Sequence, residues 1–140
     1  MAGRRRYQRI GTYGICIDDD DRVLLVRASK QSNAPGSWFL PGGGLEHGEA
    51  PLDGLRREVA EETGLTIDDV SLRGVLSDLW ALPDGAQLHT VRIVYRIGAW
   101  HGVLRAEAVG SSDHAEWVPR AELDGLPLVA YVTDALDQFG

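Results

Sequence analysis

The spacing of hydrophobic and polar positions predicts strands through most of this chain. Residues 10–18 and 23–27 are rich in β-branched and aromatic side chains, and the four consecutive aspartates at 18–21 predict a turn between them. Residues 70–82 and 87–100 are separated by the turn signal Pro83-Asp84-Gly85, so the second strand is expected to return beside the first. Shorter strands are predicted at residues 38–40 and 115–118.

Two segments have helical spacing instead. Pro51 suits the first position of a helix, and Gly64 is a natural C-terminal stop. At about 100° per residue, Leu52, Leu55 and Val59 form one apolar stripe that is expected to face the sheet. A second amphipathic helix at the C-terminus is predicted from the apolar residues Leu128, Val132, Ala135, Leu136 and Phe139.

Composition supports one soluble domain over residues 1–140, since 140 residues with 44% hydrophobic and 25% charged side chains can bury a core. No apolar run reaches the roughly 20 residues that cross a bilayer, so no membrane partner is expected. A net charge of −7 argues against generic nucleic-acid binding. The single Cys16 favours a reducing, cytoplasmic setting. The arginines near the start are interpreted as a flexible basic N-terminus at residues 1–8, with a phosphate contact as the minority hypothesis.

Candidate chemistry lies between Pro41 and Leu65. Glu58, Glu61 and Glu62 fall within an arc of about 100° on the first helix, and because like charges repel, packing alone would not select them. Hard cations such as Mg²⁺ or Mn²⁺ require oxygen ligands of this kind. The glycines 42–44 permit close backbone approach, so this loop can offer a carbonyl to a metal or N–H groups to phosphate.

Two further residues modify this helix. Gly54 lies one turn before Glu58, where a glycine costs about 0.5–1 kcal/mol relative to alanine, so a loop or a ligand is expected to approach there. Arg57 lies one turn before Glu61, a favourable spacing for an ion pair that orients a glutamate.

Together these residues match every fixed position of the pattern GX5EX7REUXEEXGU, in which U is a bulky aliphatic residue. The matching positions are Gly43, Glu49, Arg57, Glu58, Val59, Glu61, Glu62, Gly64 and Leu65. This pattern is the signature of the Nudix hydrolase family, and the chain resembles that family over this whole segment. The resemblance implies an α/β fold, the Nudix-type α/β/α sandwich with a central mixed β-sheet.

The resemblance also implies an activity. It implies a metal-dependent hydrolase that uses Mg²⁺ or Mn²⁺ to cleave a diphosphate linkage in a nucleoside diphosphate derivative by water attack on phosphorus. The substrate classes are nucleoside triphosphates, nucleotide sugars and dinucleotides, with non-nucleotide diphosphates as rivals. A Nudix-like nucleotide-binding module or regulator without catalysis is the alternative, against which the intact glutamates argue. Homodimers occur in the family, and nothing in the sequence decides this.

Site residues follow by the same resemblance. The metal is assigned to Glu58, Glu61, Glu62 and the Gly43 region, and the catalytic set is Glu49, Arg57, Glu58 and Glu61. The general base stays open between Glu58 or Glu61 and the outside candidates Glu107, Asp113 and Glu116, whereas His114 is expected to be a surface residue.

Substrate contacts are sought outside the helix. The candidates are Arg27, Trp38, Gly42, Gly44 and Arg92. Trp80, near Asp78 and Asp84, is a further candidate for lining a pocket on the second strand pair, since an aromatic ring can stack on a nucleobase.

Overall fold

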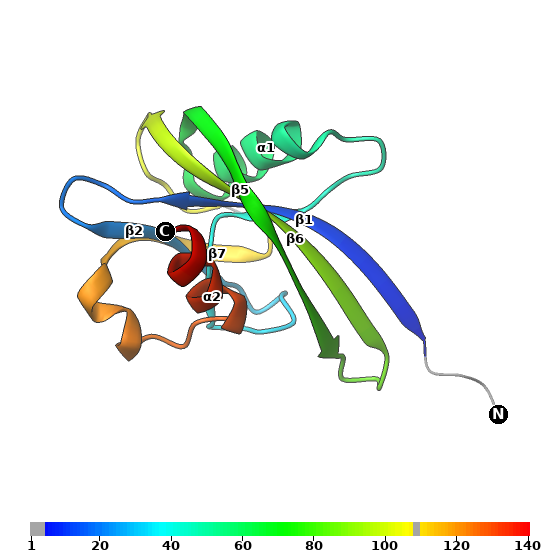
Figure 1. Ribbon diagram of the computed structural model, residues 1–140. Helices are drawn as coiled ribbons and strands as arrows, with labels where there is room; N and C mark the ends of the chain where they lie inside the picture. The colour runs from blue at the N-terminus through cyan, green and yellow to red at the C-terminus, as the bar shows by residue number, and fades with distance from the viewer. Residues whose placement is uncertain (1–4, 108–109) are drawn as a thin grey trace.

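The chain folds as two β-sheets that lie between two α-helices (Figure 1). The computed structural model describes residues 5–107 and 110–140. The elements are β1 (Arg6–Cys16), β2 (Arg22–Ala28), β3 (Trp38–Phe39), β4 (Gly42–Gly44), α1 (Pro51–Thr63), β5 (Thr66–Ala81), β6 (Gln87–His101), β7 (Ser112–Pro119), the 3₁₀ helix η1 (Arg120–Gly125) and α2 (Ala130–Phe139). Among these residues, no helix is both long and apolar enough to cross a membrane.

The larger sheet is mixed and has the strand order β4-β1-β6-β5. Its β1 and β6 run parallel, while β4 pairs with β1 and β5 with β6 in antiparallel fashion. The smaller sheet, β3-β2-β7, is antiparallel. Helix α1 lies on one side of these strands and α2 on the other (Figure 1). The predicted α/β fold with a mixed sheet between helices is therefore confirmed.

Two hydrophobic clusters hold these layers together, and alternate residues of β1 contribute to both. Tyr13 and Ile15 belong to the cluster that includes α2, whereas Cys16 belongs to the cluster that includes Leu55 and Val59 of α1. Because successive side chains of a strand point to opposite faces, the larger sheet supports both layers.

Helix α1 begins and ends as its sequence predicts. Pro51 is its first residue, and Gly64 terminates it with a left-handed φ of 78°. The apolar stripe is shorter than predicted, because Leu52 is 37% exposed while Leu55 and Val59 are fully buried. Glu62, a charged residue, occupies the buried face as well. A carboxylate at a buried position, where an apolar side chain would be expected, points to a functional site.

The strands extend beyond their predicted limits. Strand β1 begins at Arg6, before the predicted start at residue 10, because Arg6 to Ile10 pair with Gln87 to Val91 of β6. The expected flexible N-terminus at residues 1–8 therefore overlaps a paired strand, and residues 1–4 lie outside the described residues. Likewise β5 starts at Thr66, directly after α1. The pairing of β1 with β6 places Arg9 within the sheet.

Candidate active site

Arg57 is the centre of an ion-pair network on α1. Its Nε and Nη2 donate to the two carboxylate oxygens of Glu49 at 2.8 and 2.9 Å, and Nη2 also reaches the Gly44 carbonyl at 3.3 Å. Its Nη1 lies 3.0 Å from Glu58 Oε1 and 3.4 Å from Glu61 Oε2. The hydrogen bonds from Arg57 lower the pKa of Glu49 to about 2. One guanidinium thus ties the glycine strand, the following loop and two helix glutamates together.

Glu62 is the most deeply buried of the three helix glutamates, with 1% of its surface exposed. Its Oε1 accepts a hydrogen bond of 2.7 Å from the Gly42 N–H, and its Oε2 is buried without a partner among the described residues. Burial, and then the neighbouring charge of Glu58, raise the pKa of Glu62 well above its usual value. A buried acceptor without a donor is costly, which points to a positive group that completes the site.

Glu58 lies between Arg57 and the glycine strand β4. A Cβ atom on Gly43 would come within 2.8 Å of the Glu58 carboxyl carbon, so only glycine at this position lets the carboxylate lie against the backbone. Burial raises the pKa of Glu58, and the charges of Glu61 and Glu107 act in the same direction, while Arg57 opposes them. Negative charge is therefore concentrated around Glu58, Glu61 and Glu107.

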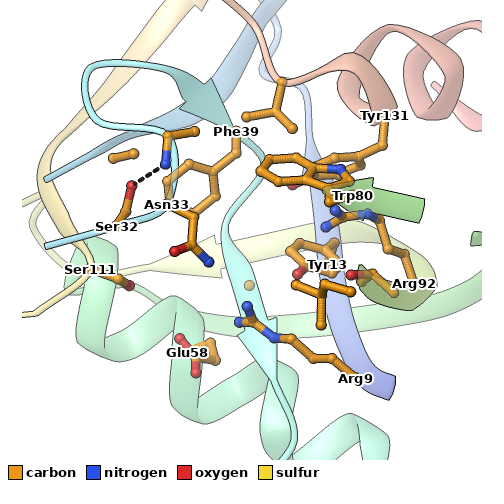
Figure 2. Close-up of a pocket in the computed structure, with 17 residues that line it drawn as sticks. Arg9, Tyr13, Ser32, Asn33, Phe39, Glu58, Trp80, Arg92, Ser111 and Tyr131 are labelled. Carbon is orange, nitrogen blue, oxygen red and sulfur yellow. Dashed lines mark hydrogen bonds between the residues drawn. The ribbon is translucent and has the colours of Figure 1, made fainter. Parts of the chain in front are cut away.

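A cavity of about 150 Å³ opens beside these carboxylates. Figure 2 shows Glu58 and Arg9 at one end of it and Trp80, Tyr131 and Arg92 at the other. Gly43 lies against Glu58, and the cavity is also lined by Gly42, Tyr13, Phe39, Leu88 and Val129. The arrangement places the Glu58 carboxylate at one end of a pocket and flat aromatic rings at the other, which suits a substrate with both charged and planar parts.

Comparison with known proteins decides the family. A model of the NUDIX domain matches residues 8–136, which is most of the chain. The chain belongs to the Nudix family. The signature segment from Gly43 to Leu65 is thus the Nudix motif, and the arrangement described above is its folded form.

Individual relatives support this assignment. The 8-oxo-dGDP phosphatase NUDT18 of Homo sapiens is 34% identical over 113 residues, which cover 78% of this chain and 32% of the human protein. The ADP-ribose pyrophosphatase of Methanocaldococcus jannaschii is 35% identical over 117 residues, covering 82% of this chain and 63% of that protein. The solved structure of a MutT NUDIX hydrolase from Burkholderia pseudomallei superimposes with a TM-score of 0.81 at 28% identity, covering 95% and 98% of the two chains. The chain thus spans about a third of the human relative.

The Nudix motif residues lie together as the sequence predicts, but their surroundings differ. Glu61 is 48% exposed and faces Arg57, so it is the outermost of the three glutamates. Gly54 packs closely against the preceding loop, since a Cβ on it would overlap Leu45 Cδ2. A loop, rather than a ligand, fills the space that this glycine leaves open.

The substrate-binding candidates are divided by the fold. Gly42 and Arg92 line the cavity, whereas Arg27, Trp38 and Gly44 do not. Arg27 pairs with Asp113 at 2.7 Å, and Trp38 is buried in the core cluster that includes α2. Arg9 lies directly over Gly44, because a Cβ on that glycine would be 2.7 Å from Arg9 Nε.

The three candidates for the general base outside the Nudix motif differ in their position relative to the motif glutamates and in their partners. Glu107 contributes to the raised pKa of Glu58 and Glu62, so its carboxylate lies within electrostatic reach of both. It accepts a hydrogen bond of 2.9 Å from the Ser112 hydroxyl. By contrast, Asp113 is paired with Arg27, Glu116 contacts His114 at 3.1 Å, and neither lines the cavity.

Several cavity residues were not predicted. Arg9 belongs to the basic cluster near the start, for which a phosphate contact is only the minority hypothesis, and the sequence does not single out Tyr13, Phe39 or Tyr131. Trp80, which is expected to line a pocket, does so. Strand alternation carried a usable signal: once β1 is extended to Arg6, residues 9 and 13 fall on the same face. Tyr131 gave no such signal, because α2 reaches the cavity only through tertiary packing.

The residues present fit a hard divalent cation. Among the residues that the structure describes, no three His, Cys, Asp or Glu side chains converge closely enough to enclose an ion. The orphaned Glu62 Oε2 and the Glu58 carboxylate beside Gly43 nevertheless supply the expected oxygen chemistry. Mg²⁺ usually retains several waters and substrate phosphates, so an open set of carboxylates is the arrangement it uses in nucleotide sites.

Proposed function

We propose that this protein is a Nudix pyrophosphohydrolase that depends on Mg²⁺ or Mn²⁺ and cleaves a diphosphate linkage in a nucleoside diphosphate derivative. The observation that carries the proposal is the buried carboxylate of Glu62, whose Oε2 has no partner among the described residues and which lies within electrostatic reach of Glu58, a residue that lines the cavity. The names of the two relatives, which refer to 8-oxo-dGDP and to ADP-ribose, support a substrate with a nucleoside diphosphate part.

Glu58, Glu62, Glu61 and the Gly43 region would hold the cation. When bound, it would neutralise the diphosphate and stabilise the charge that develops at phosphorus. Arg57 holds Glu58 in place through its 3.0 Å contact and is itself fixed by Glu49. Arg9, over Gly44 at the cavity edge, is placed to meet phosphate oxygens.

Glu58 is the proposed acceptor of the proton from the attacking water, because its carboxylate borders the cavity. Glu107 is the second candidate, since it is near Glu58 and lies outside the Nudix motif. Water attack on phosphorus forms one P–O bond and breaks the bridging P–O bond. The products are a nucleoside monophosphate and a phosphorylated remainder, or inorganic pyrophosphate from a triphosphate.

The test is product release from nucleoside triphosphates and diphosphates, nucleotide sugars including ADP-ribose, and dinucleotides, with Mg²⁺ or Mn²⁺. We expect Glu62→Gln to lower kcat/KM by roughly 10²-fold or more with its fold intact, by analogy with the loss of other preorganised catalytic groups. Glu122→Gln, an exposed carboxylate on η1, is the matched control and should retain activity. Equal turnover by Glu62→Gln, or no turnover of any compound by the wild type, would refute the proposal.

The base is tested separately at saturating metal concentration. We expect Glu58→Gln to show the largest fall in kcat, roughly 10²–10⁴-fold as for other positioned proton acceptors. A larger fall for Glu107→Gln than for Glu58→Gln would move the role to Glu107.

A further inference from the structure

The aromatic end of the cavity contains a buried cation. Arg92 on β6 is 6% exposed, and its Nε and Nη2 lie 2.7 and 3.3 Å from the two carboxylate oxygens of Asp78 on β5. Its guanidinium carbon lies 3.9 Å from the centroid of the Tyr131 ring and 5.1 Å from that of Tyr13. These contacts fix the guanidinium in one orientation, since the salt bridge and both aromatic faces constrain it.

Asp78 accepts from one N–H each of Nε and Nη2, so the second N–H of Nη2 and both N–H groups of Nη1 remain as a fork of donors. Nη1 makes no hydrogen bond to the described part of the chain, and it is not among the side-chain atoms there that are buried without a partner. Arg92 also lines the cavity, and Figure 2 shows its guanidinium beside Trp80 and Tyr13 at the aromatic end. Because Arg92 lines the cavity and Nη1 is not fully buried, its N–H groups can offer donors, and no acceptor, to a ligand in the cavity.

The walls around this nitrogen suit a planar ring. Trp80 of β5 and Tyr131 of α2 lie on one side of the cavity, and Phe39 and Asn33 lie on the other (Figure 2). Indole and phenyl faces stack on flat heterocycles. With phosphates held at the Glu58 end, a base stacked among these rings would turn an edge toward Arg92.

We propose that Arg92 makes this pocket selective for a 6-oxopurine, guanine or hypoxanthine, over adenine. This inference rests on the proposed function and assigns the base recognised by the same site. The purine edge of guanine presents two acceptors, O6 and N7, which arginine contacts as a pair. Adenine keeps the N7 acceptor but presents the N6 amino donor in place of O6, so one arginine N–H would face a donor and the paired contact would be lost. Asp78 keeps Arg92 from turning away.

The first test compares kcat/KM for GTP, ITP, ATP, and 2-aminopurine riboside triphosphate. We expect GTP and ITP to be similar, since both carry O6 and N7. ATP and the 2-aminopurine compound, which lack O6, should be roughly 10- to 100-fold poorer, the range given by one good arginine–base contact. Equal values for GTP and ATP would overturn the inference while leaving the proposed hydrolysis intact. UTP or CTP turned over as well as GTP would overturn the purine assignment.

The second test changes Arg92 itself. In Arg92→Lys, which keeps the charge but loses the planar fork, the GTP-to-ATP ratio of kcat/KM should fall toward 1, mainly through KM for GTP. Arg96→Lys, on the same strand and outside the cavity lining, is the control and should keep the wild-type ratio. A merely structural arginine would lower both activities equally and leave the ratio unchanged, which would refute the inference.

Product binding separates this inference from the proposed function. GMP and AMP are titrated by calorimetry into the wild-type protein without added metal, and GMP should bind at least about 10-fold more tightly. If no compound is hydrolysed but GMP still binds selectively, the function fails and the base assignment stands. If GMP and AMP bind equally well, or neither binds, the base assignment fails whatever the turnover.

Discussion

At the scale of single residues, the glycines at 42–44 make room for, or donate hydrogen bonds to, neighbouring charged side chains of the protein itself. Gly42 has a φ of 147°, and its N–H donates to Glu62. Gly43 leaves room for the Glu58 carboxylate, and Gly44 leaves room for the Arg9 side chain. The sequence suggested a backbone that contacts metal or phosphate directly. In the fold, the absence of side chains at Gly43 and Gly44 lets the Glu58 carboxylate and the Arg9 guanidinium lie close to β4.

Gly42→Ala is expected to destabilise the protein by about 1–3 kcal/mol, because alanine rarely adopts this φ and the backbone would be strained. The added Cβ would also clash with the Thr12 carbonyl oxygen of β1. Denaturant unfolding measures the change. Gly85→Ala, which has a φ of 85° and open space around it, is the control for backbone strain alone. Equal destabilisation of the two variants would show that the contact with β1 is unimportant.

At the scale of elements, α1 and the loop before it act as one unit. Arg57 joins Glu49 of the loop to Glu58 of the helix, and the Glu46 N–H donates to Glu49 at 3.0 Å. Gly54 allows Leu45 to pack directly against the helix. These contacts hold the start of α1 in place, although Ala50 at its N-cap position provides no capping side chain.

This unit predicts a pH dependence of stability. Glu49 has a pKa of about 2 in the folded protein against its usual 4.5, so its contribution is complete above pH 4.5 and is lost as the pH falls toward 2. Glu49→Gln should lower Tm at pH 7, and the difference from wild type should shrink between pH 4.5 and 2. Glu46→Gln, an exposed carboxylate of the same loop, should show a much smaller difference. A wild-type advantage over Glu49→Gln that stays constant down to pH 2 would contradict the assignment.

At the scale of the whole molecule, the site depends on both sheets and both helices. Cavity residues come from strands β1 to β6 and from helices α1 and α2. Folding therefore completes the pocket only when α2 packs on one side of the sheet and α1 on the other. A single domain over residues 1–140, a homodimer and a cytoplasmic location remain predictions from sequence and family resemblance.

Metal binding should stabilise this assembled state. With Mn²⁺ or Mg²⁺ at about 100 times Kd, the wild type should gain about 2.7 kcal/mol over the protein in EDTA, seen as a rise in Tm. Glu62→Gln should be at least as stable as wild type in EDTA, because it removes a buried charged group with an unpaired oxygen, yet gain little on metal addition. Equal metal-induced shifts in both proteins would exclude Glu62 as a ligand.

The sequence by itself determined the fold class, α1 with its ends, and the identity of the carboxylate cluster. The fold class follows from the family resemblance that the complete motif carries. The ends of α1 follow from local rules, namely helical spacing, a proline at the start and a glycine at the end. Even there, the sequence did not show that Glu62 is buried while Glu61 is exposed, because burial depends on which face meets β4 and β1.

Only the tertiary structure decided which residues surround the substrate pocket. Arg9, Trp80, Arg92 and Tyr131 are far apart in the chain and meet because β1 pairs in parallel with β6 and α2 packs across them. Arg92 shows the reason most clearly. On the strand alone it is one arginine among alternating residues, and its chemistry comes from Asp78 and the two tyrosine rings that the fold places around it. Contacts between residues so far apart in the chain produce no recognisable pattern in the sequence.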